Sequence, residues 1–116
     1  LKRILAARDV ENENIQKAIS YIEQNYFREQ KQKEVAGLLY IHPQYLSRLF
    51  KKELGVTFGE YLNRFRIEKA KELLLQTNMP IYVVATECGF TDAAYFCKKF
   101  HQIMATTPLR YRKNAL

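Results

Sequence analysis

The chain has 116 residues, 47% of them hydrophobic, with four Gly and three Pro, a composition that favours helices over a sheet-rich fold. Its net charge of +7 at pH 7 indicates a polyanionic partner, nucleic acid first and an acidic membrane second, although a soluble protein can also be basic by chance. No apolar run approaches the roughly 20 residues that span a bilayer, and Cys88 and Cys97 have no metal-ligand spacing. We therefore expect no membrane-spanning segment, no metal and a reducing, cytoplasmic setting.

Three helices are predicted in the first half of the chain. Apolar residues recur at helical spacing over residues 15–26, and Asn12 or Asn14 can cap this helix. Residues 31–40 predict a second, short helix. Pro43 favours the start of a third, because a first helical turn does not need the missing N–H. Two short helices joined by a tight turn form the helix-turn-helix pattern.

A long helix follows. Gly55 suits a left-handed end of the third helix, and the capping box of Thr57 and Glu60 restarts the chain as a helix that runs to about Gln76. Its apolar residues cover more than one side, which indicates contacts on more than one side. We interpret residues 58–76 as a central helix between two small cores.

The second half repeats the helix-turn-helix pattern. Pro80 opens a short helix, Thr91 caps the next one, over residues 92–103, and Thr107 with Pro108 starts the last. The predicted fold is therefore all-α, with about seven helices in two helix-turn-helix subdomains, a homeodomain-like pair, joined by a long central helix. The expected boundaries are 12–57 for the first subdomain, 58–76 for the linker helix and 77–116 for the second subdomain.

One residue pattern occurs twice, 50 residues apart. Residues 45–61 read YLSRLFKKELGVTFGEY and residues 95–111 read YFCKKFHQIMATTPLRY, with Tyr at both ends, Phe in sixth place and Thr in thirteenth. Matching helix boundaries and caps strengthen identities that would be weak alone. The repeat indicates two copies of one functional unit.

A helical wheel separates an inward and an outward face in the second helix of each unit. The inward residues are Leu46, Leu49 and Phe50, and then Phe96, Phe100 and Ile103. The outward residues are Gln44, Arg48 and Lys51, flanked by Ser47 and Lys52, and then Ala94, Lys98 and His101, flanked by Cys97 and Gln102. Arg, Gln and small apolar residues read base edges. The lysines suit phosphates, and this group is Lys51, Lys52, Lys98 and Lys99. A merely solvated helix surface is the alternative.

The remaining reactive residues give weaker signals. His42 is expected at a helix entry and His101 on the surface, with no Ser or Cys arranged for a catalytic triad. Cys97 is interpreted as a small neutral contact, with a redox-sensing thiol as the alternative, and Cys88 as buried. For Arg66 we favour a structural ion pair over contact with DNA.

Two long segments carry motifs of a known protein family. The first is EVAGLLYIHPQYLSRLFKKELGVTFGEYLNRFRIEKAKELL. The second, VVATECGFTDAAYFCKKFHQIMATTPLRYR, contains A-x-E-x-G-F-x-D-x-x-Y-F-x-x-x-F from Ala85 to Phe100, and then Thr107-Pro108 and Tyr111-Arg112. Over about residues 15–113 the chain resembles the DNA-binding domain of the AraC/XylS family of bacterial transcription regulators.

The resemblance implies how such a chain binds duplex DNA. The second helix of each unit, here called the recognition helix (about residues 43–54 and 92–103), enters a major groove, and the two grooves are adjacent. By similarity, the base-contacting residues are Gln44, Ser47 and Arg48 in the first helix and Ala93, Ala94, Cys97 and Lys98 in the second. The expected phosphate-contacting residues are Lys51, Lys52, Lys99 and His101. The first helix offers more hydrogen-bonding groups and is expected to dominate specificity.

The same resemblance implies partners. Promoter or operator double-stranded DNA is the expected partner and RNA polymerase a further one. No membrane partner, enzymatic activity or cofactor is expected. Residues 1–11 resemble the tail of a linker from an N-terminal domain, so we expect a monomeric fragment and a full-length protein that dimerises through that domain. The alternatives are a protein-interaction module and an alkyl-transfer repair protein that uses Cys97.

The chain departs from the family pattern at three places. The family usually has Ser or Thr between two apolar residues at the entry to the second helix, and this chain has Gln30-Lys31-Gln32 there. This predicts a weak cap for that helix. Phe27 is expected to supply the packing that the two apolar residues would have made. Ala105 replaces a usual Gly, so the last turn is expected to differ. Ala93 and Ala94 replace longer polar residues, so we expect the second recognition helix to read sequence weakly, or through shape and phosphates.

Overall fold

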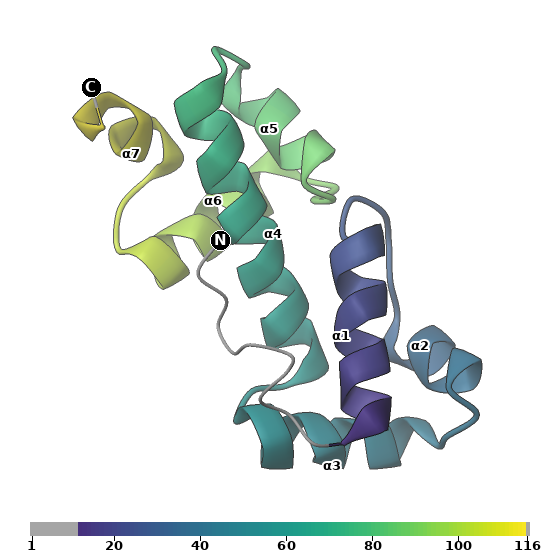
Figure 1. Ribbon diagram of the computed structural model, residues 1–116. Coiled ribbons are helices and arrows are strands. Elements are labelled where there is room, and N and C mark those ends of the chain that lie inside the picture. The colour runs from purple at the N-terminus through teal and green to yellow at the C-terminus, as the bar shows by residue number, and fades with distance from the viewer. Residues whose placement is uncertain (1–11, 116) are drawn as a thin grey trace. The chain divides into compact units, whose positions relative to one another are not determined.

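Seven helices make up the part of the chain that the computed structural model describes, residues 12–115 (Figure 1). They are α1 (Glu13–Asn25), α2 (Gln32–Leu38), α3 (Pro43–Leu54), α4 (Phe58–Gln76), α5 (Ile81–Glu87), α6 (Ala93–Met104) and α7 (Pro108–Asn114). No strand occurs in this range, so the predicted all-α class is confirmed. The expected linker over residues 1–11 lies outside the described residues. No helix in the described range is long and apolar enough to cross a membrane.

The chain forms two compact units that divide after Leu62. The first unit contains α1, α2, α3 and the first residues of α4, and the second contains the rest of α4 with α5, α6 and α7. In the first unit α2, α3 and α1 contact one another, and in the second unit α6 contacts α5 and α7. Each unit therefore holds one helix-turn-helix pair, α2–α3 or α5–α6.

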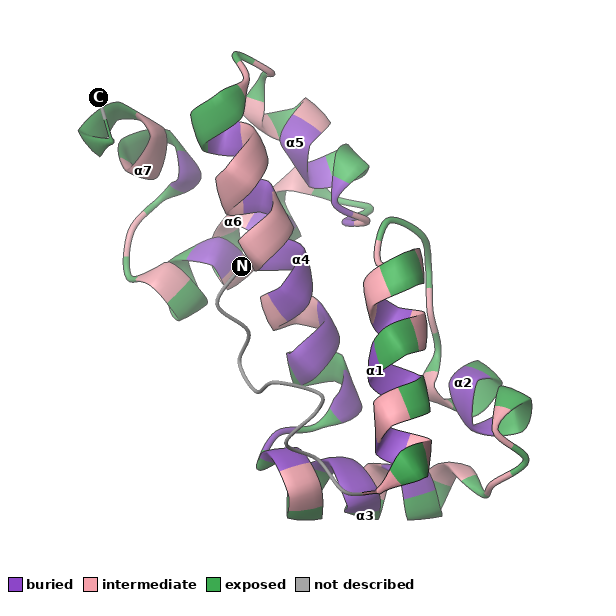
Figure 2. Cartoon of the chain, viewed as in Figure 1, coloured by how far each residue is buried: buried purple, intermediate pink, exposed green. Residues whose placement is uncertain are grey.

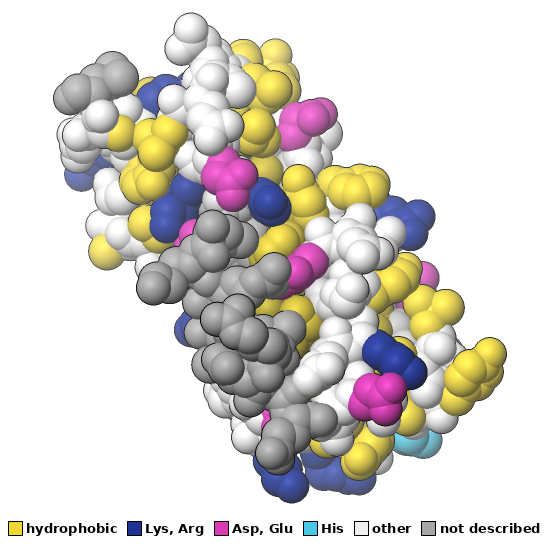
Figure 3. Space-filling model, viewed as in Figure 1, with side chains coloured by type: hydrophobic (Ala, Val, Ile, Leu, Met, Phe, Trp, Pro, Cys, Tyr) yellow, Lys and Arg dark blue, Asp and Glu magenta, His cyan; other side chains and the backbone are white. Residues whose placement is uncertain are grey.

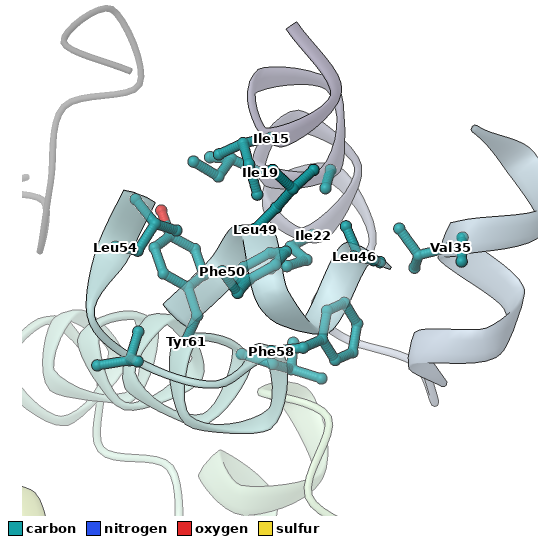
Figure 4. Packing of buried hydrophobic residues seen from close by; sticks show 14 residues of the cluster. Ile15, Ile19, Ile22, Val35, Leu46, Leu49, Phe50, Leu54, Phe58 and Tyr61 are labelled. Carbon is teal, nitrogen blue, oxygen red and sulfur yellow. The ribbon is translucent and has the colours of Figure 1, made fainter. Parts of the chain in front are cut away.

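The core of the first unit is built around Phe50 of α3. Its ring is fully buried and makes edge-to-face contacts with Phe58 and Tyr61, with centroids 5.6 and 6.0 Å apart (Figure 4). One stripe of α1 closes this core with Ile15, Ala18, Ile19 and Ile22. Burying such a large apolar side chain contributes roughly 1.5–3 kcal/mol. This packing fixes which face of α3 points away from the core.

The core of the second unit repeats the arrangement with aromatic residues of α6. Phe96 and Phe100 are fully buried, with ring centroids 5.8 Å apart. Phe96 also contacts Phe90 at 5.1 Å, and Phe100 contacts Tyr111 of α7 at 5.6 Å. Four rings thus anchor α6 on one side, as Phe50 and its neighbours anchor α3.

Arg112 of the family motif ties α7 to the end of α4. Its Nε donates a hydrogen bond to the carbonyl of Leu74 at 2.9 Å, and its Nη1 donates to the carbonyl of Met79 at 2.7 Å. The carbonyls at a helix C-terminus have no partners within the helix. Arg112 therefore satisfies one carbonyl in the last turn of α4 and one in the segment that follows the helix.

Three helix starts have the capping residues that the sequence predicts. The side chain of Asn12 accepts from the first turn of α1, and Thr107 accepts from the N–H of Arg110 in α7. The capping box of α4 is formed in both directions: Thr57 Oγ1 accepts from the N–H of Glu60 at 3.1 Å, and the Glu60 carboxylate accepts from the N–H of Thr57 at 2.8 Å. These bonds satisfy N–H groups that have no helical partner.

Two expectations for α6 are wrong. Thr91 does not cap the helix: Asp92 does, and its carboxylate accepts from the N–H of Tyr95 at 3.0 Å. Ile103 is 37% exposed, whereas Met104 packs against the core. The reason is spacing, because a stripe with steps of four residues from Phe96 through Phe100 arrives at position 104.

The entry to α2 lacks a side-chain cap, as predicted. Lys31 occupies the cap position and makes no capping hydrogen bond. The expectation that Phe27 supplies packing there is wrong, because Phe27 is 53% exposed and its ring contacts that of Tyr26. The Nε2 of Gln32 instead donates to the carbonyl of Pro43 at 2.8 Å, which connects the start of α2 to α3.

Candidate nucleic-acid interface

Helix α3 presents a polar face on the side away from the first core. His42 lies at the helix entry, as predicted, and its Nδ1 accepts from the N–H of Gln44 at 3.2 Å. The buried residues of α3 are Leu46, Leu49, Phe50 and Leu54 (Figure 2). The exposed ones include Gln44, Arg48, Lys51 and Lys52, and Ser47 is half-buried. The outward face predicted by the helical wheel is therefore present.

This face of α3 is basic and slightly hollowed. A recess of about 690 Å³ is lined by Asn12, Tyr45, Ser47, Arg48, Leu49, Lys51, Lys52 and Glu53. Lys and Arg side chains gather over α3 at the bottom of the view in Figure 3. Lys51 and Lys52 lie in the last turn, where the helix dipole favours cations. Clustered cations beside a hollow raise the local positive potential and attract anions.

The matching face of α6 is less polar. Ala94, Lys98 and His101 are exposed, and Ala93, Cys97 and Lys99 are partly buried. Ala93 and Cys97 pack against the second core. An exposed alanine offers a thymine methyl only an apolar contact. Lys98 is therefore the strongest hydrogen-bond donor that α6 offers to a base.

Each recognition helix carries a tyrosine near its start with a cation beside the ring. In α3 the guanidinium carbon of Arg48 lies 6.0 Å from the ring centroid of Tyr45. In α6 the Nζ of Lys99 lies 5.5 Å from the ring centroid of Tyr95. Asn63 Nδ2 also donates to the hydroxyl of Tyr95 at 3.3 Å. Neither tyrosine is among the predicted contacts, although each opens one copy of the repeated pattern.

The two thiols are poorly suited to nucleophilic chemistry. Cys88 is fully buried, and burial raises the pKa of its thiol to about 12, with a further contribution from Glu87. Burial also raises the pKa of the Cys97 thiol. A thiol acts as a nucleophile through its thiolate, which a raised pKa makes scarce at neutral pH. No group of three or more His, Cys, Asp or Glu residues gathers as a metal site within residues 12–115.

Arg66 is buried within the second unit. It is 9% exposed, and its guanidinium carbon lies 5.7 Å from the ring centroid of Phe90. Burial lowers the pKa of this guanidinium, while Tyr95 and Cys88 oppose the shift. The burial agrees with a structural role, and the expected ion pair stays a prediction.

Known proteins share both the sequence and the fold. A family model described as a helix-turn-helix domain matches residues 35–114. The regulatory protein PocR of Salmonella typhimurium is 37% identical over 99 residues, which are 85% of this chain and 33% of PocR. An uncharacterised helix-turn-helix transcriptional regulator of Escherichia coli, YijO, is 41% identical over 80% of this chain and 33% of its own length. The chain therefore spans about a third of the length of these relatives.

Solved structures agree with the family match. The C-terminal domain of AraT, a response regulator from Geobacillus stearothermophilus, is 36% identical with a TM-score of 0.86, covering 89% of this chain and 86% of that one. A transcriptional regulator from Chromobacterium violaceum, described as containing an AraC-type DNA-binding domain, is 27% identical with a TM-score of 0.81, covering 86% and 89%. The two helix-turn-helix units, the family model and these structures together show that the chain belongs to the AraC-type helix-turn-helix family.

Proposed function

We propose that this chain is the DNA-binding part of a bacterial transcription regulator and binds duplex DNA sequence-specifically. The observation that carries the proposal is the pair of matched recognition helices, α3 and α6, each anchored by aromatic residues on one side and exposing basic residues on the other. The names of its relatives support it, because PocR is a regulatory protein and the Chromobacterium relative has an AraC-type DNA-binding domain.

The roles divide between affinity and specificity. We propose that Gln44, Ser47 and Arg48 of α3, with Ala93, Ala94, Cys97 and Lys98 of α6, face base edges in successive major grooves. Lys51, Lys52, Lys99 and His101 bind phosphates and add affinity without reading sequence. Amide and guanidinium groups pair with adenine and guanine. Helix α3, which exposes both groups, accordingly dominates specificity.

Other features of the proposal follow from this role. Two recognition helices in one chain do what a dimer achieves by symmetry, so the fragment is expected to bind DNA as a monomer. The full-length protein would work in the cytoplasm, where its DNA lies, and would contact RNA polymerase. A non-enzymatic role fits the raised pKa of the Cys97 thiol, which disfavours the alkyl-transfer alternative.

Selection from a randomised duplex pool tests the proposal. The wild-type chain is selected on 30-base-pair duplexes at near-physiological salt, and enriched sequences are read. We expect two enriched blocks, the stronger one assigned to α3. Failure to enrich any sequence, with binding that only fades as salt rises, would contradict sequence-specific recognition.

The variant Arg48→Ala then shows which enriched block α3 reads. It is expected to cost about 1–3 kcal/mol on the selected duplex and to relax the preference at one base pair. Lys51→Ala is the matched control on the same helix face, and it should weaken all duplexes about equally. A uniform loss in Arg48→Ala would move Arg48 to the phosphate-contacting group.

A further inference from the structure

We propose that Tyr45 is a positioning residue that holds Arg48 ready to read a base edge. The inference rests on the proposed function, because it assigns a role within the DNA-reading face of α3. Tyr45 precedes Arg48 by three residues, so their side chains are neighbours on one helix face. The guanidinium carbon of Arg48 lies 6.0 Å from the ring centroid of Tyr45, within the range of a cation–π contact.

This contact reduces the side-chain entropy that Arg48 loses when it binds DNA. A long arginine side chain on a helix surface samples many rotamers, and reading a base requires one of them. An aromatic ring restricts the guanidinium beforehand while its planar N–H donors stay available for two acceptors on guanine. The ordering cost then falls on folding rather than on binding, which is the general benefit of preorganisation.

The position of both residues suits this role. Tyr45 is 38% exposed, so its ring is accessible to the neighbouring side chain. Tyr45, Ser47 and Arg48 line the same recess on α3. The ring therefore supports Arg48 on the surface that the proposed function assigns to DNA.

The second unit uses its equivalent tyrosine differently. The ring of Tyr95 lies beside Lys99, whereas the counterpart of Arg48 in the repeat is Lys98. Tyr95 is also held from α4 by the hydrogen bond from Asn63. One tyrosine thus supports a proposed base contact and the other a proposed phosphate contact. This difference agrees with the stronger specificity expected of α3.

The test measures discrimination at the base pair that Arg48→Ala relaxes, as the ratio of Kd values for the changed and the selected duplex. Tyr45→Leu is expected to lower this ratio about threefold, the scale of an exposed cation–π contact, with little change in Kd for an unrelated duplex. Tyr45→Phe keeps the ring and should keep the ratio. Tyr95→Leu is the matched control and should leave this base pair unaffected.

A double-mutant cycle identifies the route of the effect. If Tyr45 acts through Arg48, Tyr45→Leu causes no further loss of discrimination in the Arg48→Ala background. A further loss of the same size, or an equal loss in Tyr45→Phe, would overturn the proposal, because Tyr45 would then contact DNA itself. Circular dichroism of each variant checks that the helices are retained.

Failure of the proposed function has a different signature. A wild-type chain that enriches no sequence leaves no base pair for Arg48 to read, and both proposals fall together. If Arg48→Ala relaxes one base pair and Tyr45→Leu leaves it unchanged, the proposed function stands and the positioning role alone is overturned.

Discussion

Two backbone positions in each helix-turn-helix unit are left-handed, and the units occupy them with different residues. After α2 the residue is Tyr40, with φ of 58°, and after α5 it is Gly89, with φ of 93°. After α3 it is Gly55, with φ of 73°, and after α6 it is Ala105, with φ of 59°. A Cβ disfavours this conformation by roughly 1–2 kcal/mol. Each unit therefore contains one helix end, at Tyr40 or at Ala105, where glycine would remove backbone strain.

Replacing Ala105 by Gly is expected to stabilise the protein by about 1 kcal/mol. The N–H of Ala105 donates to the carbonyl of His101 at 2.8 Å, and glycine retains this bond. The side chain of Ala105 is exposed, so its removal costs no core packing. Urea denaturation measures the gain as a higher midpoint with an unchanged slope.

Gly55→Ala is the matched control at the end of α3. A Cβ at Gly55 would meet no atom within 4 Å, so the cost of this substitution is conformational and not steric. It should destabilise the protein by a similar amount, about 1 kcal/mol. If Ala105→Gly were no more stable than the wild type, the left-handed end of α6 would not be the strained conformation that its φ indicates.

At the scale of the element, α2 begins without a side-chain cap, as α5 does after Pro80. The helices α1, α6 and α7 each begin with a side chain that accepts from a backbone N–H. Lys31 cannot do so, because an ammonium group is a donor only. Its backbone is already extended, with φ of −116° and ψ of 140°, as a cap position requires.

Lys31→Ser is expected to stabilise the protein by about 1 kcal/mol. Glu34 lies three residues later, so the substitution completes a capping box of the kind that Thr57 and Glu60 form in α4. Thermal denaturation measures the gain. Lys33→Ser removes the same charge from the same helix without placing a hydroxyl at the cap, and it should give no gain. Equal effects of the two substitutions would attribute the change to charge instead.

Local chemistry explains what the sequence predicted well. Pro43, Gly55 and the pair Thr57 and Glu60 act through their own backbone preferences and hydrogen bonds, so their roles hold without knowledge of distant residues. The inward face of α3 follows in the same way from helical spacing. These signals were sufficient for the helices and for the outward positions of most candidate DNA contacts.

The remaining features depend on the backbone path and on side-chain rotamers. Thr91 and Asp92 are both good caps, and only the extended backbone at Asp92 decides between them. The pairing of Tyr45 with Arg48 requires a particular rotamer of each side chain. Spacing places Tyr45 beside Arg48 on the helix, but it sets neither these rotamers nor the choice between Thr91 and Asp92.

At the scale of the whole molecule, some lysines are paired with a carboxylate on the same helix, and others are exposed at the end of a recognition helix. The Nζ of Lys71 lies 3.0 Å from Oε2 of Glu68, and the Nζ of Lys17 lies 3.8 Å from Oε1 of Glu13. Part of the positive charge is therefore paired with a carboxylate on the same helix. Lys51 and Lys52 are exposed at the end of α3. Affinity for a polyanion can depend on the net charge of +7 or on the position of these lysines on the recognition helix. The salt dependence of DNA binding separates the two.

The triple variant Lys51→Gln, Lys52→Gln and Lys99→Gln is expected to reduce the slope of log K against log salt by about 2.7, since each lost phosphate contact removes about 0.9. The triple control substitutes Gln for Lys17, Lys71 and Lys113, and it lowers the net charge by the same three units. Its slope should stay close to that of the wild type. Equal reductions in both variants would show that net charge governs binding and that the lysines of α3 and α6 hold no particular phosphates. A reduction confined to the first variant would instead place the phosphate contacts on the recognition helices, where their register on the duplex brings the neighbouring base-reading residues to the groove.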